Sequence, residues 1–385
     1  MELAPFPCQG RLPGLRRAIS LHPSGCVQLC AAQYKPPGGG RGKPARRFAK
    51  LVRVSATDYD LTLLPDVSHV DAEDERRRLL IIVNPYASTV SDRLRRLVVA
   101  ALRGGYIVDA IDTERRDHAT ELCREAAQEG YDAVVAFGGD GTVNEAANGL
   151  VGTRTPLTCL PGGRANVYCR MLGIPADVID ATEHLLALAR GWRTRQVDLG
   201  CVGGRYFLFS AGVGLDANVV ARVDSRPRLK ARLGEYYYAW VATTTFGRRY
   251  LLRPPRLAAE LGSRQGAQAP VEGVTVVVQN ASPYTFFGNR GVEMAHGASL
   301  SSGDLAGLVL KRTNPLDIPS IAWRALWPWA QVSGHRQVEP FSAETHVRVR
   351  SLDDRPLPVQ VDGDYLGHAA EHSFTVSPQA LTVLA

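Results

Sequence analysis

The sequence contains no apolar segment that approaches the ~18 residues of a membrane-spanning helix. Its start, Met1-Glu2-Leu3-Ala4-Pro5, lacks the charged beginning and apolar stretch of a secretory leader. The seven cysteines are scattered rather than spaced as a disulfide framework. We therefore expect reduced thiols, a cytoplasmic location and, if the protein meets a membrane, only peripheral contact with it.

The length and charge of the chain set the next limits. With 385 residues, 45% of them hydrophobic, the chain is long enough for two globular domains and some irregular sequence. There are 45 basic and 38 acidic residues, a formal net charge of +7. This balance favours anionic partners, such as nucleotides, nucleic acid or acidic membrane surfaces, without choosing among them.

Composition and periodicity divide the chain into three parts. Residues 1–75 are rich in glycine, proline and charge, and we interpret them as an irregular, disordered extension. Residues 76–195 alternate apolar strand-like runs with helical patterns, which predicts an α/β domain with a largely parallel sheet. Residues 196–385 hold short strand-like runs between turns and predict a mainly β domain, a sandwich, whose last strand could return to the first domain.

The strands of the α/β domain are expected at 79–83, 106–112, 131–137 and 156–161. In the β domain, runs at 206–210, 274–279, 306–310, 346–349 and 373–376 predict strands, whereas residues 229–246 look helical.

A glycine-rich turn, Gly138-Gly139-Asp140-Gly141-Thr142, leaves a buried strand and enters a helix. Glycines let the backbone approach phosphates, and free amides at a helix start attract them. Asp140 would then hold or orient Mg²⁺. An ordinary tight turn is the alternative, and the lysine of a P-loop is missing. Two further loops, 84–88 and 161–166, follow strands of the same sheet and could present donors to the same nucleotide.

Six motifs occur together in this order: Asn84-Pro85, residues 138–145, Pro161-Gly162-Gly163 with Asn166, Gly212-Val213-Gly214-Leu215-Asp216, Gln279-Asn280 with Gly288, and Val361-Asp362-Gly363-Asp364. In these motifs, residues 76–385 resemble the diacylglycerol, sphingosine and ceramide kinases and their bacterial lipid-kinase relatives. The resemblance implies an ATP- and Mg²⁺-dependent transfer of phosphate to the hydroxyl of diacylglycerol or a related lipid. It also implies a transient anionic membrane surface as partner, and no nucleic acid.

The resemblance assigns roles to individual residues. Asp364 would be the base that accepts the lipid hydroxyl's proton, with Asp140 as the second catalytic residue and Mg²⁺ ligand. The residues expected on the lipid substrate's side are Gly212, Gly214, Asp216 and Asn280. The residues expected to bind ATP are Asn84, Thr113, Gly138, Gly139, Asp140, Gly141, Thr142, Asn144, Gly163, Arg164 and Asn166.

Three positions depart from the pattern of these relatives. Asp364 stands where glutamate is usual, and Arg164 stands where a small hydroxyl residue is common. In residues 301–306 only Asp304 remains of an acid-rich segment that supports a structural Mg²⁺ in many bacterial relatives, so that metal site is doubtful here.

Several alternatives stay open. Residues 361–367 also fit a simple hairpin. Basic residues between Arg222 and Arg232, followed by Tyr236-Tyr237-Tyr238 and Trp240, fit either a membrane-facing surface or a solvated helix face. An NAD kinase and a catalytically inactive nucleotide-binding scaffold are the competing functions. The identity of the lipid and the oligomeric state, a homodimer included, are not readable from the sequence.

Overall fold

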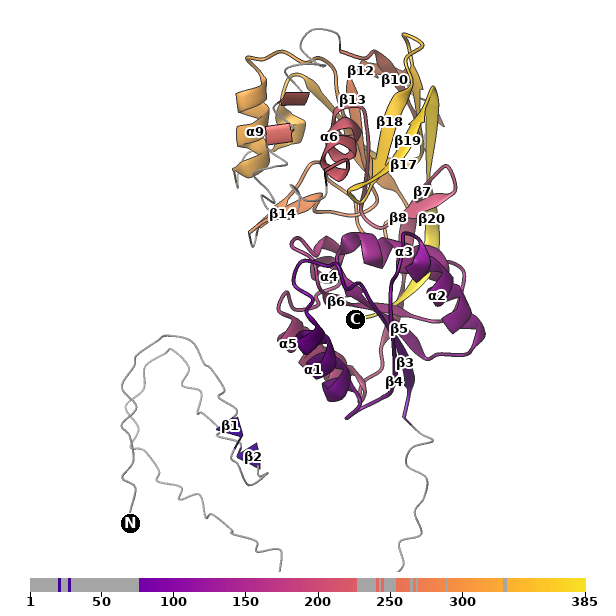
Figure 1. Ribbon diagram of the computed structural model, residues 1–385. Helices are drawn as coiled ribbons and strands as arrows, with labels where there is room; N and C mark the ends of the chain where they lie inside the picture. The colour runs from indigo at the N-terminus through magenta and orange to yellow at the C-terminus, as the bar shows by residue number, and fades with distance from the viewer. Residues whose placement is uncertain are drawn as a thin grey trace, which may run out of the picture. The chain divides into compact units, whose positions relative to one another are not determined.

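The computed structural model describes residues 76–226, 240–241, 244–245, 254–263, 266–267, 269–288, 290–327 and 331–385, and also the short antiparallel pair β1 (Ser20–Leu21) and β2 (Val27–Gln28). The chain divides into two compact units, residues 1–68 and 69–385. The second unit contains all the elements from β3 onward (Figure 1). Apart from β1 and β2, the predicted extension lies outside the described residues, as does most of the helix predicted at 229–246.

The first half of the second unit is built on four parallel strands in the order β4-β3-β5-β6. Continuous apolar runs suit strands that are covered on both faces, and helices lie on both sides of the sheet in Figure 1. The strands are β3 (Arg78–Val83), β4 (Ile107–Asp112), β5 (Ala133–Gly138) and β6 (Leu157–Pro161). The helices are α1 (Asp92–Leu102), α2 (His118–Gln128), α3 (Asp140–Leu150), α4 (Val167–Met171) and α5 (Val178–Leu188).

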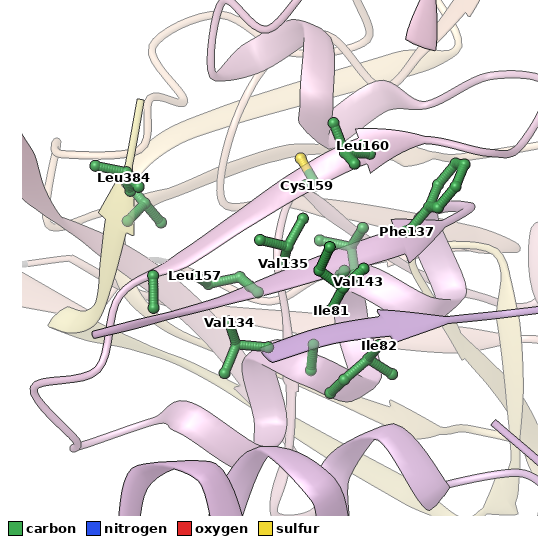
Figure 2. Close-up of a cluster of buried hydrophobic side chains, with 14 of the residues drawn as sticks. Ile81, Ile82, Val134, Val135, Phe137, Val143, Leu157, Cys159, Leu160 and Leu384 are labelled. Carbon is green, nitrogen blue, oxygen red and sulfur yellow. The ribbon is translucent and has the colours of Figure 1, made fainter. Parts of the chain in front are cut away.

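Every residue of β5 and β6 is buried, and so are five of the six residues of β3. Figure 2 shows Ile81, Val135 and Leu160 from these strands in one cluster with Val143 of α3. Each of these four side chains is at most 1% exposed. A central parallel strand therefore meets apolar partners above and below, which explains why its sequence does not alternate.

The second half is rich in strands. The helices whose bounds are described in it are α6 (Leu215–Asp224), α9 (Ile318–Leu326) and the 3₁₀ turn η3 (Val332–Gly334), and residues 240–241 and 244–245 are also helical. Its strands are β7 (Thr194–Val202), β8 (Arg205–Phe207), β9 (Ser210–Val213), β10 (Leu257–Ser263), β11 (Gly266–Ala267), β12 (Val271–Gly273), β13 (Thr275–Gln279), β14 (Thr285–Phe287), β15 (Arg290–Val292), β16 (Leu305–Leu310), β17 (Val338–Ser351), β18 (Leu357–Val361), β19 (Asp364–Ala369) and β20 (Glu371–Leu384).

Strand β17 changes partners along its length. Residues 338–344 pair with β16, and residues 344–351 pair with β10, while β20 lies on the other side of its second half. Side chains from both groups of strands, such as Val278, Val309, Val349 and Phe374, share one core. The fold class predicted from the sequence, a parallel α/β part followed by a strand-rich part, is confirmed.

Strand β20 joins the two halves into one sheet. It pairs with β7 along most of its length, and near its end Val383 pairs in parallel with Leu157 of β6. Leu381, Val383 and Leu384 are fully buried there, and Figure 2 shows Leu384 beside the parallel strands. Among the described residues, no helix combines the length and apolar content needed to cross a membrane.

Candidate active site

The carboxyl ends of the parallel strands define where the site lies. Strand β3 lies between β4 and β5 in the sheet, so the strand order reverses there. The chain therefore leaves β3 and β5 toward opposite faces of the sheet, and a crevice forms at the carboxyl ends of these two strands. A pocket of about 430 Å³ occupies this position. It is lined by Asn84, Tyr86, Thr113, Glu114, Arg115, Arg116, Gly141, Thr142, Glu145 and Asp364.

Five of the predicted site residues line this pocket: Asn84, Thr113, Gly141, Thr142 and Asp364. The Asn84 side chain links two of the loops, since its Nδ2 donates to Thr142 Oγ1 at 3.0 Å and its Oδ1 accepts from the Tyr86 amide at 3.0 Å. The Thr113 amide continues the sheet by donating to the Val83 carbonyl at 2.8 Å. Four separate segments of the chain therefore converge on one cavity.

The first turn of α3 forms one wall of the pocket. Gly139 caps the helix without a side-chain hydrogen bond, so the helix start presents backbone amides. A Cβ atom at Gly141 would lie 3.2 Å from Asp364 Oδ2. The Asp364 carboxylate, from the first residue of β19, therefore lies directly against the start of α3. A phosphate held by this helix would have a carboxylate beside it.

The two glycine loops pack backbone against backbone beside the pocket. A Cβ atom at Gly163 would lie 2.8 Å from the Gly139 Cα, and the Gly162 amide donates to the Gly138 carbonyl at 2.8 Å. Asn166 closes its own loop, because its side chain both accepts from the Gly163 amide and donates to the Gly163 carbonyl. The predicted Gly138, Gly139, Gly163 and Asn166 thus shape the loops without lining the cavity, and the predicted Arg164 is exposed and does not line it either.

Asp140 is turned toward the neighbouring loop. Its Oδ1 accepts from the Tyr168 amide at 3.0 Å, at the start of α4. Burial raises the pKa of this carboxyl, and the negative charge of Asp364 adds to the shift. Asp140 therefore connects α3 to α4 and lies behind the pocket wall, close enough to Asp364 for the two charges to interact.

The last motif is a hairpin turn anchored by its first aspartate. Asp362 is buried, and its carboxylate accepts hydrogen bonds from the amides of Leu208, Phe209 and Ser210 and from Asn144 Nδ2, at 2.6–3.0 Å. Burial nevertheless raises the pKa of Asp362 to about 6. Positive φ angles at Asp362 and Gly363 shape the turn that brings Asp364 to the pocket. The hairpin interpretation and a functional role for Asp364 are thus compatible.

Asn144, in α3 of the α/β half, donates a hydrogen bond to Asp362 of the strand-rich half. It is 1% exposed, and besides Asp362 its side chain contacts the Tyr206 carbonyl and Arg205 Nε. The structure places it beneath the site as a bridge between α3 and the strand-rich half, away from the pocket where an ATP-binding role was expected.

The four residues expected on the substrate side do not line the pocket. Gly214 has φ +96°, and a Cβ atom there would lie 2.7 Å from the Val274 carbonyl oxygen. Asn280 is fully buried and donates to the carbonyls of Asp198 and Leu208. A Cβ atom at Gly212 would lie 2.1 Å from Asp216 Oδ2, so Asp216 covers this glycine.

Three lining residues lie outside every segment singled out from the sequence: Glu114, Arg115 and Arg116. Tyr86 and Glu145 lie in the predicted loop 84–88 and motif 138–145, but the sequence assigned them no role of their own. The pair Arg115-Arg116 directly after a strand end was a usable signal, because cations at that edge suit a phosphate ligand. Arg116 Nη2 also donates to the Tyr365 carbonyl at 3.4 Å, which connects the β4–α2 loop to the residue after Asp364. Arg115 forms an ion pair with Glu121.

Asp304, the remaining acid of the 301–306 segment, has a second carboxylate nearby. The charge of Asp304 contributes to the raised pKa of Glu344, although burial is the larger cause. Within the described residues, no group of three or more His, Cys, Asp or Glu side chains gathers as a metal site. Glu344 lies far along the sequence from Asp304, so no local motif could have indicated it.

Residues 78–202 match the model of the diacylglycerol kinase catalytic domain. A diacylglycerol kinase of Bacillus subtilis (strain 168) is 33% identical over 167 residues, 42% of this chain and 53% of that protein. A protein of Pseudomonas syringae pv. tomato named "Probable lipid kinase YegS-like" is 35% identical over 173 residues, 44% of this chain and 54% of that protein.

The chain thus spans about half the length of these curated relatives. The crystal structure of a diacylglycerol kinase from Bacillus anthracis str. Sterne shares the fold, with a TM-score of 0.61 and 22% identity, over 80% of this chain and 97% of that one. The match of the catalytic-domain model covers β3 to β7, including the glycine-rich turn and both neighbouring loops. Residues 78–202 therefore resemble the diacylglycerol kinase catalytic domain.

Proposed function

We propose that this protein is a lipid kinase that transfers the γ-phosphate of ATP to the hydroxyl of diacylglycerol or a related lipid. The observation that carries the proposal is the position of Asp364. Its carboxylate lies against Gly141 at the start of α3, in a pocket that also contains Asn84, Thr113 and Thr142. A phosphate-binding helix start and a carboxylate that can accept a proton are therefore adjacent, as phosphoryl transfer to an alcohol requires.

In this proposal the ATP phosphates bind at the ends of β3, β4 and β5. The amides at the start of α3 and the dipole of that helix attract negative charge. Arg115 and Arg116 add cationic donors to the lining of the same pocket. The pocket volume of about 430 Å³ is in the ordinary range for a small-molecule site.

The residues present also suit a magnesium ion brought in with ATP. Mg²⁺ usually takes one or two protein carboxylates and completes its shell with phosphate oxygens and water. Asp364 lies in the pocket and would supply a carboxylate to the ion, whereas Asp140 lies behind the wall and would act on the ion through its charge. The ion would supply neutralisation of the charge on the phosphates.

Asp364 is proposed as the group that accepts the lipid hydroxyl's proton. Its turn is fixed by the four hydrogen bonds to Asp362, so the carboxylate is presented by a rigid element. Aspartate is one methylene shorter than the glutamate usual in these relatives, and it still reaches the start of α3 at Gly141.

A lipid substrate requires the protein to reach a bilayer. Trp323 of α9 and Trp327 just beyond it stack with ring centroids 5.7 Å apart, and both are about half exposed. Leu316, on the approach to α9, is 84% exposed. Indole rings favour the headgroup region, and a chain of net charge +7 is attracted to anionic lipid. We propose that this α9 surface rests on an anionic membrane; most of the basic and aromatic stretch at 222–240 lies outside the described residues.

The test is phosphate transfer from labelled ATP and Mg²⁺ to lipids in mixed micelles, with NAD offered in the same assay. The Asp364→Asn variant is run in parallel. Labelled phosphatidic acid from the unmodified protein, absent with the variant, would support the proposal. Labelled NADP would make the protein an NAD kinase, and ATP binding without any product would favour an inactive scaffold.

A further inference from the structure

Gln360 connects the turn that carries Asp364 to a second carboxylate outside the pocket. It is 1% exposed and precedes Val361 at the end of β18. Its Oε1 accepts from the Gly363 amide at 2.9 Å, and its Nε2 donates to Asp216 Oδ2 at 2.5 Å. The amide of Gly363 can only donate, so the Gln360 oxygen must face it and the Gln360 nitrogen must face Asp216.

Asp216 is fixed from three sides. It lies in the first turn of α6, and its Oδ1 accepts from the Tyr284 hydroxyl at 2.8 Å. Its Oδ2 fills the space where a side chain at position 212 would begin, which explains the need for glycine there. Asp216 is therefore a fixed acceptor for Gln360 Nε2. Gln360 in turn accepts from the amide of Gly363, the residue before Asp364.

The turn thus has two separate supports. Asp362 is held by the amides of residues 208–210 and by Asn144 of α3, whereas Gly363 is held by α6 through Gln360. The second support acts on the amide of Gly363, in the Asp362–Gly363 peptide group. Because Gly363 is the one residue between that peptide group and Asp364, its hydrogen bond limits where the Asp364 carboxylate points.

We propose that Asp216 and Gln360 are positioning residues that aim the Asp364 carboxylate at the start of α3. The proposal rests on the lipid-kinase function proposed above. It gives the Gly212–Asp216 segment a role that acts through Asp364, although none of its residues lines the pocket.

The direction of these hydrogen bonds allows a sharp test by exchange. In Asp216→Asn, one oxygen remains for the two groups that donate to this side chain, the Tyr284 hydroxyl and Gln360 Nε2, so the two donors compete for it. In Gln360→Glu, a carboxylate faces the Asp216 carboxylate, so two acceptors meet. In the double variant, the new amide at position 216 donates to the new carboxylate at position 360, and that carboxylate also accepts from the Gly363 amide. Both hydrogen bonds are then restored, with the negative charge moved from one side chain to the other.

The experiment measures kcat, the KM for ATP and the unfolding temperature of the three variants in the full-length chain, with diacylglycerol in mixed micelles. Each single substitution is expected to lower kcat by about 10- to 100-fold, as small displacements of a reacting group do. The KM for ATP should stay within about 2-fold, because Asn84, Thr113 and α3 are untouched. The double variant should recover kcat to within about 5-fold of the unmodified protein.

Tyr284→Phe is the matched control. It removes the other hydrogen bond of Asp216 and leaves Gln360 and Gly363 connected. Its unfolding temperature should fall, while kcat should change by less than about 2-fold. If this control lowers kcat as much as Asp216→Asn does, the effect is one of general stability and the proposal is overturned.

The possible failures are distinguishable. An unmodified protein that phosphorylates no lipid defeats the proposed function itself. An active protein whose double variant is no better than the worse single variant defeats the positioning role alone. If a single variant fails to fold, a folded double variant with kcat within about 5-fold of the unmodified protein supports the hydrogen-bond exchange, and a folded but inactive one overturns it.

Discussion

Two turns that combine glycine and aspartate meet at the pocket, one from each half of the molecule, and they use their acids differently. In the turn after β5, Asp140 faces the amides at the start of α4. In the turn after β18, Asp362 faces the amides of Leu208 to Ser210, and only the second acid, Asp364, lines the pocket. In both turns an aspartate, Asp140 or Asp362, fixes the loop by accepting backbone hydrogen bonds. Only the second turn has another aspartate, Asp364, whose side chain reaches the pocket.

The largest effect should come from the acid that lines the pocket. Asp364→Asn keeps the shape of the side chain but cannot accept the proton, so we expect a loss of kcat of about 10²- to 10⁴-fold. ATP binding, measured by calorimetry, should be retained. Asp354→Asn, at an exposed turn of the same half, is the control and should be neutral. Turnover of Asp364→Asn within about 3-fold of the unmodified protein would exclude Asp364 as the base.

Asp140→Asn tests whether the anchoring acid also acts through its charge. The asparagine oxygen can still accept from the Tyr168 amide, so the unfolding temperature should change by only a few degrees. Removing the charge near the phosphates and Mg²⁺ should lower kcat by about 100-fold. Full turnover in the folded variant would show that Asp140 only fixes the loop. Of the two turns, only the one that carries Asp364 would then contribute an acid to the reaction.

Gly141→Ala probes the point where the two turns touch. The added methyl group would lie about 3.2 Å from Asp364 Oδ2 and should push the carboxylate away. We expect kcat to fall about 10-fold with the KM for ATP little changed. Gly191→Ala introduces the same group where no other atom lies within 4 Å and is the matched control. Equal activity of the two variants would show that Asp364 tolerates displacement.

Arg116→Gln weakens the connection between the halves at the other side of the pocket. It removes a cation from the wall and the donor to the Tyr365 carbonyl. The KM for ATP should rise about 3- to 5-fold, and the effect should shrink as salt is added. Arg124→Gln, an exposed arginine of α2, supplies the control. An identical KM for both variants would remove Arg116 from nucleotide binding.

The combined substitution Trp323→Ser and Trp327→Ser tests whether the α9 surface, in the strand-rich half, binds the membrane. Binding to vesicles that contain phosphatidylglycerol, measured by sedimentation, should fall by a few fold, because the indole rings would no longer enter the headgroup region. Activity toward a short-chain, water-soluble diacylglycerol should be unchanged. Leu97→Ser, at a similarly exposed position of α1, tests whether any lost apolar side chain has the same effect. Equal losses would place the membrane surface elsewhere.

Local pattern was enough to predict the parallel sheet, because each of its strands is a largely apolar run followed by a polar or glycine-containing loop. The long strands β17 and β20 were predicted only in part, as 346–349 and 373–376. In β20, Pro378 and a register shift between Ser377 and Leu381 interrupt the apolar alternation, so the sequence pattern ends before the strand does. Pairing with β7 carries the strand across that interruption.

The sequence predicted where the site lies better than it predicted what each residue does there. The sequence indicated that loops at one sheet edge converge, and five of their residues do line the pocket. The roles of Asn144 and Asp362 depend on partners 218 residues apart, and no spacing rule can supply such contacts. Arg115 and Arg116 were missed because the resemblance assigned no role to the loop after β4 beyond Thr113.

The pairing of β20 with β6 has a consequence for how the protein is made. The ribosome completes the α/β half long before residue 383 emerges, and until then β6 lacks its partner and the core lacks Leu381, Val383 and Leu384. Each of these side chains contributes roughly 1.5–3 kcal/mol when buried. The nascent α/β half therefore carries an unpaired strand edge throughout synthesis of the strand-rich half, which is the condition under which a chain depends on chaperones, and a truncation of a few residues at β20 would leave it in that state permanently.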